Sequence, residues 1–350
     1  MHMPDHGSSL GYNFPSLAAI TPYLEPTASG PSTDWAKRTA KRLDSLVSVG
    51  YPEVASTDRR QLSSLSSTIT DEGGDDVPRE ENLPTNVHPD QDLGLHSTSN
   101  GEDRHIIKRY NSTVTVSPAG DIQAHYRKTH LYFTDESWAT ASPSKFLTTN
   151  LSFPSLSSLL NSTSPRLPPL TQKNRSADGT NHVKHVAPDD YTPKATDASN
   201  PKLTTTFGIC MDLNPNAFTA PWSSYELATH TLLSHSQLLI ISMAWCTHEP
   251  TSLPSNSSDI HLESMSYWIS RLKPLIDAEE EIVVVIANRC GMEKAEEGGE
   301  EDVHYVGSSW IGKVGKGEVK IWGILGCGEE AVLKVDTEEE PKFRVVARVT

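Results

Sequence analysis

The sequence predicts an α/β fold in which helices cover a central sheet. Residues 281–287 form one nearly continuous apolar run, typical of a strand that is buried on both faces. After residue 110, short apolar runs and stretches of helical periodicity follow in the order strand, strand, strand, helix, strand, helix, strand. A covered sheet explains this order, and 350 residues are enough to bury a sizeable core.

The first third of the chain contains one predicted helix and three predicted strands. After a short apolar piece at residues 16–24, a helix should begin with Ser32 or Thr33 as its N-cap. Residues 48–53 follow as a strand, and residues 110–116 and 122–126 should form a hairpin around a turn at 117–121. Residues 56–102 are rich in Ser, Thr, Asp, Gly and Pro without apolar periodicity, which predicts a disordered insertion.

The rest of the chain alternates strands and helices after a second irregular stretch. Residues 160–200 are predicted to be another disordered insertion, preceded by a short helix near 156–160. Helices are expected at 225–236 and 262–278, and Pro274 should kink or end the second. Strands are expected at 204–210, 237–245, 281–287, 303–310, 319–325 and 331–335. We therefore expect one domain over residues 11–335 that carries the two insertions.

Charge and cysteine usage narrow the classes of function. The formal net charge is −15, which argues against nucleic acid or an anionic membrane as a partner. The four cysteines lie far apart in sequence, so no paired zinc spacing exists, and we expect no metal or cofactor. No secretory pattern and no apolar run near 20 residues occurs. These features predict a cytoplasmic protein with reduced thiols.

Cys210 stands where a predicted strand ends. The run from Thr204 to Ile209 is β-branched and apolar, and Asp212, Asn214 and Pro215 after it are turn formers. A rigid strand would hold the thiol at the sheet edge, which suits a nucleophile, although a free cysteine is more often a small buried hydrophobe. Lys128 ends the predicted hairpin, and residues 288–293 end the buried strand in polar residues. Strand ends of this kind form sites in α/β sheets.

The chain resembles the nitrilase, or carbon–nitrogen hydrolase, superfamily, and within it the protein N-terminal asparagine/glutamine amidohydrolases. The resemblance runs in family order from about residue 11 to about residue 335, with the irregular stretches as insertions. The matching motifs are Gly11-Tyr12-Asn13-Phe14, Pro22-Tyr23-Leu24-Glu25-Pro26, Val49-Gly50-Tyr51-Pro52-Glu53, Tyr126-Arg127-Lys128-Thr129-His130-Leu131, Asp135-Glu136-Ser137-Trp138, Gly208-Ile209-Cys210-Met211-Asp212-Leu213, Ser242-Met243-Ala244-Trp245 and Ala287-Asn288-Arg289-Cys290-Gly291.

The resemblance implies an α-β-β-α sandwich, a Glu–Lys–Cys triad and hydrolysis of the side-chain amide of a terminal Asn or Gln on a protein or peptide. Carried over, Cys210 attacks the amide carbon, and the Lys128 ammonium stabilises the oxyanion and lowers the pKa of the thiol. Glu136 matches a further acidic position that orients the lysine and the leaving group. Asp212 pairs with the substrate's α-ammonium or forms an Asx turn. Trp245 lines the pocket or, as the stronger alternative, packs in the core.

The chain departs from the family pattern at its start. In the family the catalytic glutamate precedes the Gly-Tyr-Asn-Phe motif at the end of an apolar strand, whereas the first glutamate here is Glu25. Pro4-Asp5 overlays the family's Pro-Glu only if one residue is inserted. We expect that the N-terminal strand and helix of the sandwich are missing and that turnover is impaired. Two alternatives therefore stay open: another carbon–nitrogen hydrolase acting on small amides, and an impaired relative that binds peptide N-termini.

Overall fold

The computed structural model describes residues 13–57, 106–153, 202–247, 249, 252–294 and 302–346. Some predicted features lie outside this part of the chain, so the expectations about them stay predictions. They are Asp5, nearly all of the two predicted insertions and the predicted short helix near 156–160. Residues 56 and 57 are described, and they continue a strand rather than open the insertion.

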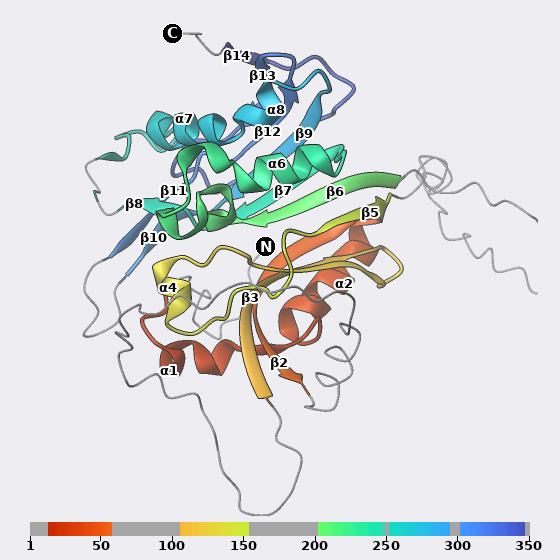
Figure 1. Cartoon of the computed structure of the whole chain (residues 1–350), viewed down its shortest axis with the longest axis vertical. Helices are drawn as coiled ribbons and strands as arrows, with labels where there is room; N and C mark the ends of the chain where they lie inside the picture. Colours follow the sequence, from red (N-terminus) through yellow and green to blue (C-terminus); the bar gives the residue numbers. More distant parts are fainter. Residues whose placement is uncertain are drawn as a thin grey trace, which may run out of the picture.

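Two sheets form the centre of the structure (Figure 1). The smaller has the order β1-β2-β3-β4, and the larger has the order β14-β13-β12-β9-β7-β6-β5. A third sheet, β10-β11-β8, extends from one end of the larger. The strands are β1 (Glu25–Pro26), β2 (Val47–Thr57), β3 (Ile106–Val116), β4 (Ile122–Arg127), β5 (Thr148–Ser152), β6 (Lys202–Ile209), β7 (Leu238–Met243), β8 (Cys246–Thr247), β9 (Ile282–Asn288), β10 (Cys290–Glu293), β11 (Val303–Val306), β12 (Trp310–Gly315), β13 (Glu318–Ile324) and β14 (Phe343–Val346).

Helices cover the outer faces of the smaller and of the larger sheet. In Figure 1, α6 (Glu226–Leu233), α7 (Leu262–Arg271) and α8 (Lys273–Ile276) lie on the far side of the larger sheet from β2 and β3. The helix α2 (Pro31–Leu43) packs against β2 and β3. The short helices α1 (Leu17–Ile20) and α4 (Phe133–Glu136) lie near the end where β8, β10 and β11 gather. This layering is the α-β-β-α sandwich that the sequence resemblance implies.

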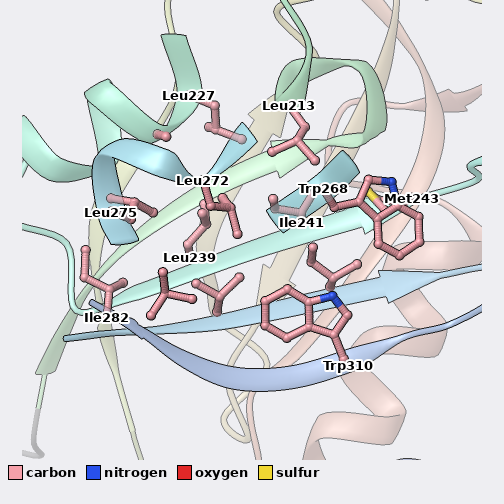
Figure 2. Close-up of a cluster of buried hydrophobic side chains, with 14 of the residues drawn as sticks. Leu213, Leu227, Leu239, Ile241, Met243, Trp268, Leu272, Leu275, Ile282 and Trp310 are labelled. Atoms are coloured by element: carbon pink, nitrogen blue, oxygen red, sulfur yellow. The ribbon is translucent and has the colours of Figure 1, made fainter. Parts of the chain in front are cut away.

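The main core includes the side chains between the larger sheet and its helices, and it also contains Ala124 and Tyr126 of β4 in the smaller sheet. Figure 2 shows Leu239 and Ile241 of β7 facing Leu227 of α6, Leu272 just before α8 and Leu275 of α8. Alternate residues of β7 and β9 face this layer, and burying each such side chain contributes about 1.5–3 kcal/mol. Met243, at the carboxyl end of β7, belongs to the same core, so the strand end that reaches the pocket described below is anchored by packing.

Several predicted boundaries are corrected by the structure. The helix α2 begins at Pro31 with Gly30 as N-cap, because the Glu25 carboxylate takes the N–H of Ser32 at 2.9 Å and no hydroxyl cap is needed. The predicted strand at 303–310 is divided into β11 and the start of β12 by a turn in which Gly307 and Ser308 have positive φ. No strand forms at 331–335, and β14 closes that edge of the sheet instead.

The expected break at Pro274 is present. Helix α7 ends at Arg271, and α8 begins at Lys273 with the proline in its first turn, where its missing N–H costs nothing. Within the described residues, no helix is long and apolar enough to cross a membrane.

Candidate active site

Cys210 occupies a strained backbone position at the end of β6. Its φ is +43°, in the left-handed region that a residue with a Cβ adopts only when the surroundings impose it. The strand ends at Ile209, and a 3₁₀ turn over Cys210–Leu213 follows directly. Because β6 is held by β5 and β7 on either side, the turn presents the thiol from a fixed scaffold.

A pocket of about 300 Å³ opens beside the thiol, where β6, β7 and β9 of the larger sheet end next to the middle of β2 and β3. This volume lies at the small end of the range for ligand pockets, so it suits a single side chain better than a large molecule. Its walls come from β2, β3, β6, β7, β9 and the segments around α1 and α4. They are formed by Phe14, Ile20, Gly50, Tyr51, Pro52, Asn111, Thr113, Trp138, Ile209, Cys210, Ser242, Met243, Ala244, Ala287 and Arg289.

Lys128 brings a buried positive charge to the thiol. It follows β4 directly, it is fully buried, and its Nζ lies 2.6 Å from Oδ2 of Asp135. Burial acts to lower the pKa of Lys128, but the charges of Asp135 and Cys210 outweigh it and raise that pKa. Lys128 therefore stays an ammonium ion at neutral pH, close enough to Cys210 for their charges to interact.

Asp135 is held in place by further hydrogen bonds. Its Oδ2 also accepts the N–H of Tyr132 at 3.0 Å, and its Oδ1 accepts Nδ2 of Asn111, likewise at 3.0 Å. Asn111 itself lines the pocket. The carboxylate thus joins the lysine, the start of α4 and the pocket wall into one rigid unit.

The thiol of Cys210 is protonated at neutral pH. Burial raises the pKa of Cys210 to about 11, against the opposing effects of the Lys128 charge and of a hydrogen bond from the backbone of Ala244. Lys128 lowers the pKa of Cys210, as expected, but desolvation of the thiolate has the larger and opposite effect. The thiol must lose its proton as it attacks, and Lys128 and Ala244 then stabilise the negative charge that appears.

Asp212 links segments of the chain and is not available to bind the substrate. It is fully buried, and both oxygens are occupied by donors from the chain itself. Oδ1 accepts the N–H groups of Thr129 and His130 at 3.1 and 2.8 Å, while Oδ2 accepts the hydroxyl of Tyr126 and the N–H of Ile209, each at 2.7 Å. Asp212 therefore fastens the Lys128 segment to the Cys210 turn, and no oxygen remains for a substrate ammonium.

Two other predicted site residues are not part of the pocket wall. Glu136 is exposed on α4, whereas its neighbour Asp135 holds the lysine, so the orienting carboxylate is one residue earlier than predicted. Trp245 does not line the pocket: its ring packs against Tyr267 and Trp268 at centroid distances of 5.4 and 5.8 Å. Core packing, the stronger alternative for Trp245, fits this position.

The sequence reasoning missed Asp135 and Arg289 as residues of the site. Asp135 lies seven residues after Lys128 within a quoted motif, but α4 is too short for periodicity to show which acid faces inward. Arg289 follows β9 on the pocket wall, where Glu293 holds it at 3.2 Å and the ring of Tyr305 stacks on it. Among the described residues, no group of His, Cys, Asp and Glu is arranged to hold a metal ion.

Comparison with known proteins gives consistent relatives. No family model matches the chain. It is 24% identical over 343 residues to the protein N-terminal amidase of Schizosaccharomyces pombe, covering 94% of this chain and 84% of that protein. The protein N-terminal amidase of Saccharomyces cerevisiae is 25% identical over 236 residues, which are 67% of this chain and only 34% of that protein.

Solved structures of an N-terminal amidase share the fold. The complex with an Asn-Glu-Ala peptide aligns with a TM-score of 0.57 at 18% identity, covering 91% of this chain and 84% of that one. The complex with a Gln-Val peptide has a TM-score of 0.56 with the same identity and coverage. In sequence and in fold, the chain is thus similar to protein N-terminal amidases, and it shares with the solved N-terminal amidase the fold described above.

Proposed function

We propose that this protein hydrolyses the side-chain amide of an N-terminal Asn or Gln of a protein or peptide, which yields Asp or Glu and ammonia. The observation that carries the proposal is a strained cysteine on the wall of a pocket that fits one side chain, with a buried ammonium ion close enough for its charge to act on the thiol. The homologues' shared name supports the substrate class, since both are protein N-terminal amidases.

The first chemical step follows from the charges at the pocket. The Cys210 sulfur attacks the amide carbon, and its proton ends on the leaving nitrogen, which departs as ammonia. Negative charge that develops on the carbonyl oxygen is stabilised by Lys128, a fixed donor in a site shielded from water. A thioester between Cys210 and the substrate carbonyl remains.

The second step is hydrolysis of that thioester. Water adds to the same carbonyl carbon, Lys128 again stabilises the oxyanion, and the sulfur leaves and regains a proton. The balance is one amide and one water consumed, with one carboxylic acid and one ammonia released. Asn111, Thr113 and Ser242 supply polar atoms to an otherwise mainly apolar pocket, an arrangement that suits a short amide-bearing side chain.

We also propose the cytoplasm as the place of this reaction and the N-degron pathway as its setting, where an acidic terminal residue would mark the product for degradation. All four cysteines are free thiols, which supports a reducing compartment.

Ammonia release from short peptides tests the function. We expect turnover of peptides that begin with Asn or Gln, slower turnover of their N-acetylated forms, and no turnover by Cys210→Ala. Cys246→Ser serves as the matched control, because Cys246 lies close enough to Cys210 to affect its pKa but has no predicted role. Equal rates with and without the acetyl group would indicate a hydrolase of small amides. Peptide binding without any ammonia release would indicate the impaired relative.

A further inference from the structure

A second hollow lies beside the Cys210 pocket along the same edge of the larger sheet. The pocket is built where β6, β7 and β9 end, and the hollow, of about 850 Å³, is built where β9 ends, β12 begins and β13 ends. Because β12 is antiparallel to both β9 and β13, with Trp310 opposite Ile286 and Ile324, the end of β9, the start of β12 and the end of β13 lie at the same edge of the larger sheet. We call this space the side hollow; its walls are residues 288–292, 307–309, 325–326 and 329–332.

We infer that the side hollow binds the polypeptide segment that follows the terminal residue of the substrate, and that Glu330 gives it a preference for basic side chains. The inference rests on the proposed function. A pocket of about 300 Å³ has room for the terminal residue alone, so the rest of a protein substrate must leave along the surface. The side hollow is the large open space that adjoins the pocket at this edge.

Arg289 joins the two spaces. It lines both the pocket and the side hollow, and three contacts fix its position. The Glu293 carboxylate lies 3.2 Å from Nη1, the Tyr305 ring stacks at 4.5 Å, and the backbone N–H of Arg289 donates to Met243 O at 3.0 Å. A chain that passes from the pocket over Arg289 enters the side hollow directly.

The charge of the side hollow is negative. Arg289 is neutralised by Glu293, which leaves Glu329 and Glu330 as the other charged residues of its wall. Glu329 uses Oε2 to accept the N–H of Gly326 at 3.0 Å. The Glu330 carboxylate lies over Gly291, with Oε1 3.9 Å from the place that a Cβ on this glycine would take. Its charge is close enough to Cys290 to raise the pKa of that thiol, an effect second to burial.

The shape and surface of the hollow suit a long basic side chain. A Cβ on Gly307 would lie 2.2 Å from Cys327 O, and one on Gly326 would lie 2.2 Å from Ser257 O, so glycine backbone forms part of the wall. Val332 and Met292 are exposed beside it. Apolar side chains of this kind accommodate the methylene stem of Lys or Arg, while a carboxylate at the far end meets the charged group.

The test compares three Asn-initiated peptides that differ only at the second and fourth positions, which carry Lys, Gln or Glu. For the wild type at low salt we expect kcat/KM to be about two- to fivefold higher for the Lys peptide than for the Glu peptide, with the difference shrinking as salt rises. Glu330→Gln should bring the ratio close to one, and Glu330→Lys should invert it. A wild-type ratio near one, or a ratio that both variants leave unchanged, would overturn the inference.

Two controls keep the result specific. Glu279→Gln makes the same change of charge on an exposed residue before the start of β9, at the other end of the strand, so it should retain the wild-type ratio. Turnover of the Gln-containing peptide tests the proposed function separately from the preference. If no peptide is turned over, fluorescence anisotropy with the same peptides labelled at their C-termini decides the question: tighter binding of the Lys peptide that is lost in Glu330→Gln supports the side hollow, and equal binding refutes it.

Discussion

Two adjacent residues at the end of β4 each meet a buried carboxylate, on opposite faces of the same sheet. Alternation along the strand turns Ala124 and Tyr126 toward the main core, while His125 contacts Glu53 on the other face. Arg127 lies on the same face as His125 and pairs with Glu53; we call these two residues the outer pair. Lys128 lies on the same face as Ala124 and Tyr126 and pairs with Asp135; we call these two residues the inner pair. The two pairs are alike in chemistry and differ in what surrounds them.

The outer pair bonds to residues of its own layer. Glu53 is fully buried and accepts hydrogen bonds from Thr27, Ser112, His125 and Arg127 at 2.5–3.2 Å. Although burial acts to raise the pKa of Glu53, these hydrogen bonds outweigh it and lower that pKa well below its usual range. The ring of Tyr110 covers the guanidinium at 4.1 Å. Every strong partner is a neighbour within the small sheet or the segment before α2, so the cluster stabilises this layer.

The inner pair faces a reactive group. Lys128 interacts with the Cys210 thiol across the junction of the two sheets, and Asp135 reaches the pocket wall through Asn111. The comparison teaches that a buried ion pair with shifted pKa values does not by itself mark a site. The inner pair differs from the outer pair because a nucleophile and an open cavity lie on its side of the sheet.

Removing the inner ammonium should have the largest effect on turnover. Lys128→Met is expected to lower kcat/KM for Asn-initiated peptides by about 10²–10³-fold, because the oxyanion loses its charged partner. It should also lower the free energy of unfolding by about 3–5 kcal/mol, because Asp135 stays buried without its counter-ion. Ammonia release and urea denaturation measure the two effects.

A double variant separates these two effects. Lys128→Met with Asp135→Leu removes both charges, so much of the lost stability should return while turnover stays low. If turnover returned together with stability, Lys128 would be a structural residue and the difference between the inner and outer pairs would disappear.

The second prediction concerns which acid positions the lysine. Asp135→Asn should lower kcat/KM by about 10²-fold through misplacement of the ammonium. The pKa of Lys128 should also fall, because burial lowers it and Asp135 is the main opposing charge, so activity should decline at a lower pH on the alkaline side than in the wild type. Glu136→Gln, the matched control, should change kcat/KM by less than about twofold, since Glu136 is exposed. A larger loss for Glu136→Gln than for Asp135→Asn would restore the assignment made from the sequence.

Much of the fold could be predicted because local signals agree with the tertiary structure. The apolar run before Asn288 is β9, the break at Pro274 separates α7 from α8, and the turn formers after Cys210 end β6. The predicted strand at 331–335 failed because its apolar residues pack over Gly323 in irregular backbone, with Leu333 and Val335 as the nearest side chains. Short apolar runs do not distinguish a strand from a loop that covers one.

The candidate site could be predicted only in part. Cys210 and Lys128 each stand at a strand end that the sequence reveals, and the structure brings them together. The place of Asp212 depends on Tyr126, Thr129 and His130, which lie more than 80 residues away in the chain, and no local pattern shows that these donors occupy both of its oxygens. The net pKa of the thiol likewise depends on burial, which is a property of the assembled sandwich.

The third prediction tests the outer pair and should show the smallest effect on turnover. Arg127→Met removes the strongest donors to Glu53, which leaves this carboxylate to His125, Ser112 and Thr27. We expect a loss of about 2 kcal/mol in the free energy of unfolding, below the value for a fully buried pair because Arg127 is one-quarter exposed. At a temperature where the variant is folded, kcat/KM should stay within about twofold of the wild type, since Tyr51 alone among the residues of the outer cluster lines the pocket.

The pH dependence of stability gives an independent test of the outer pair. Glu53 has a lowered pKa when folded, so its contribution to stability is complete above its unfolded value of about 4.3 and is lost as the pH falls from there through the folded pKa. Arg127→Met should raise the folded pKa of Glu53 and therefore narrow the gap between stability at pH 7 and at pH 2, as measured by urea denaturation at both. A variant that lost turnover at full stability would mean instead that the outer pair acts on the thiol, and the two faces of the sheet would form one site.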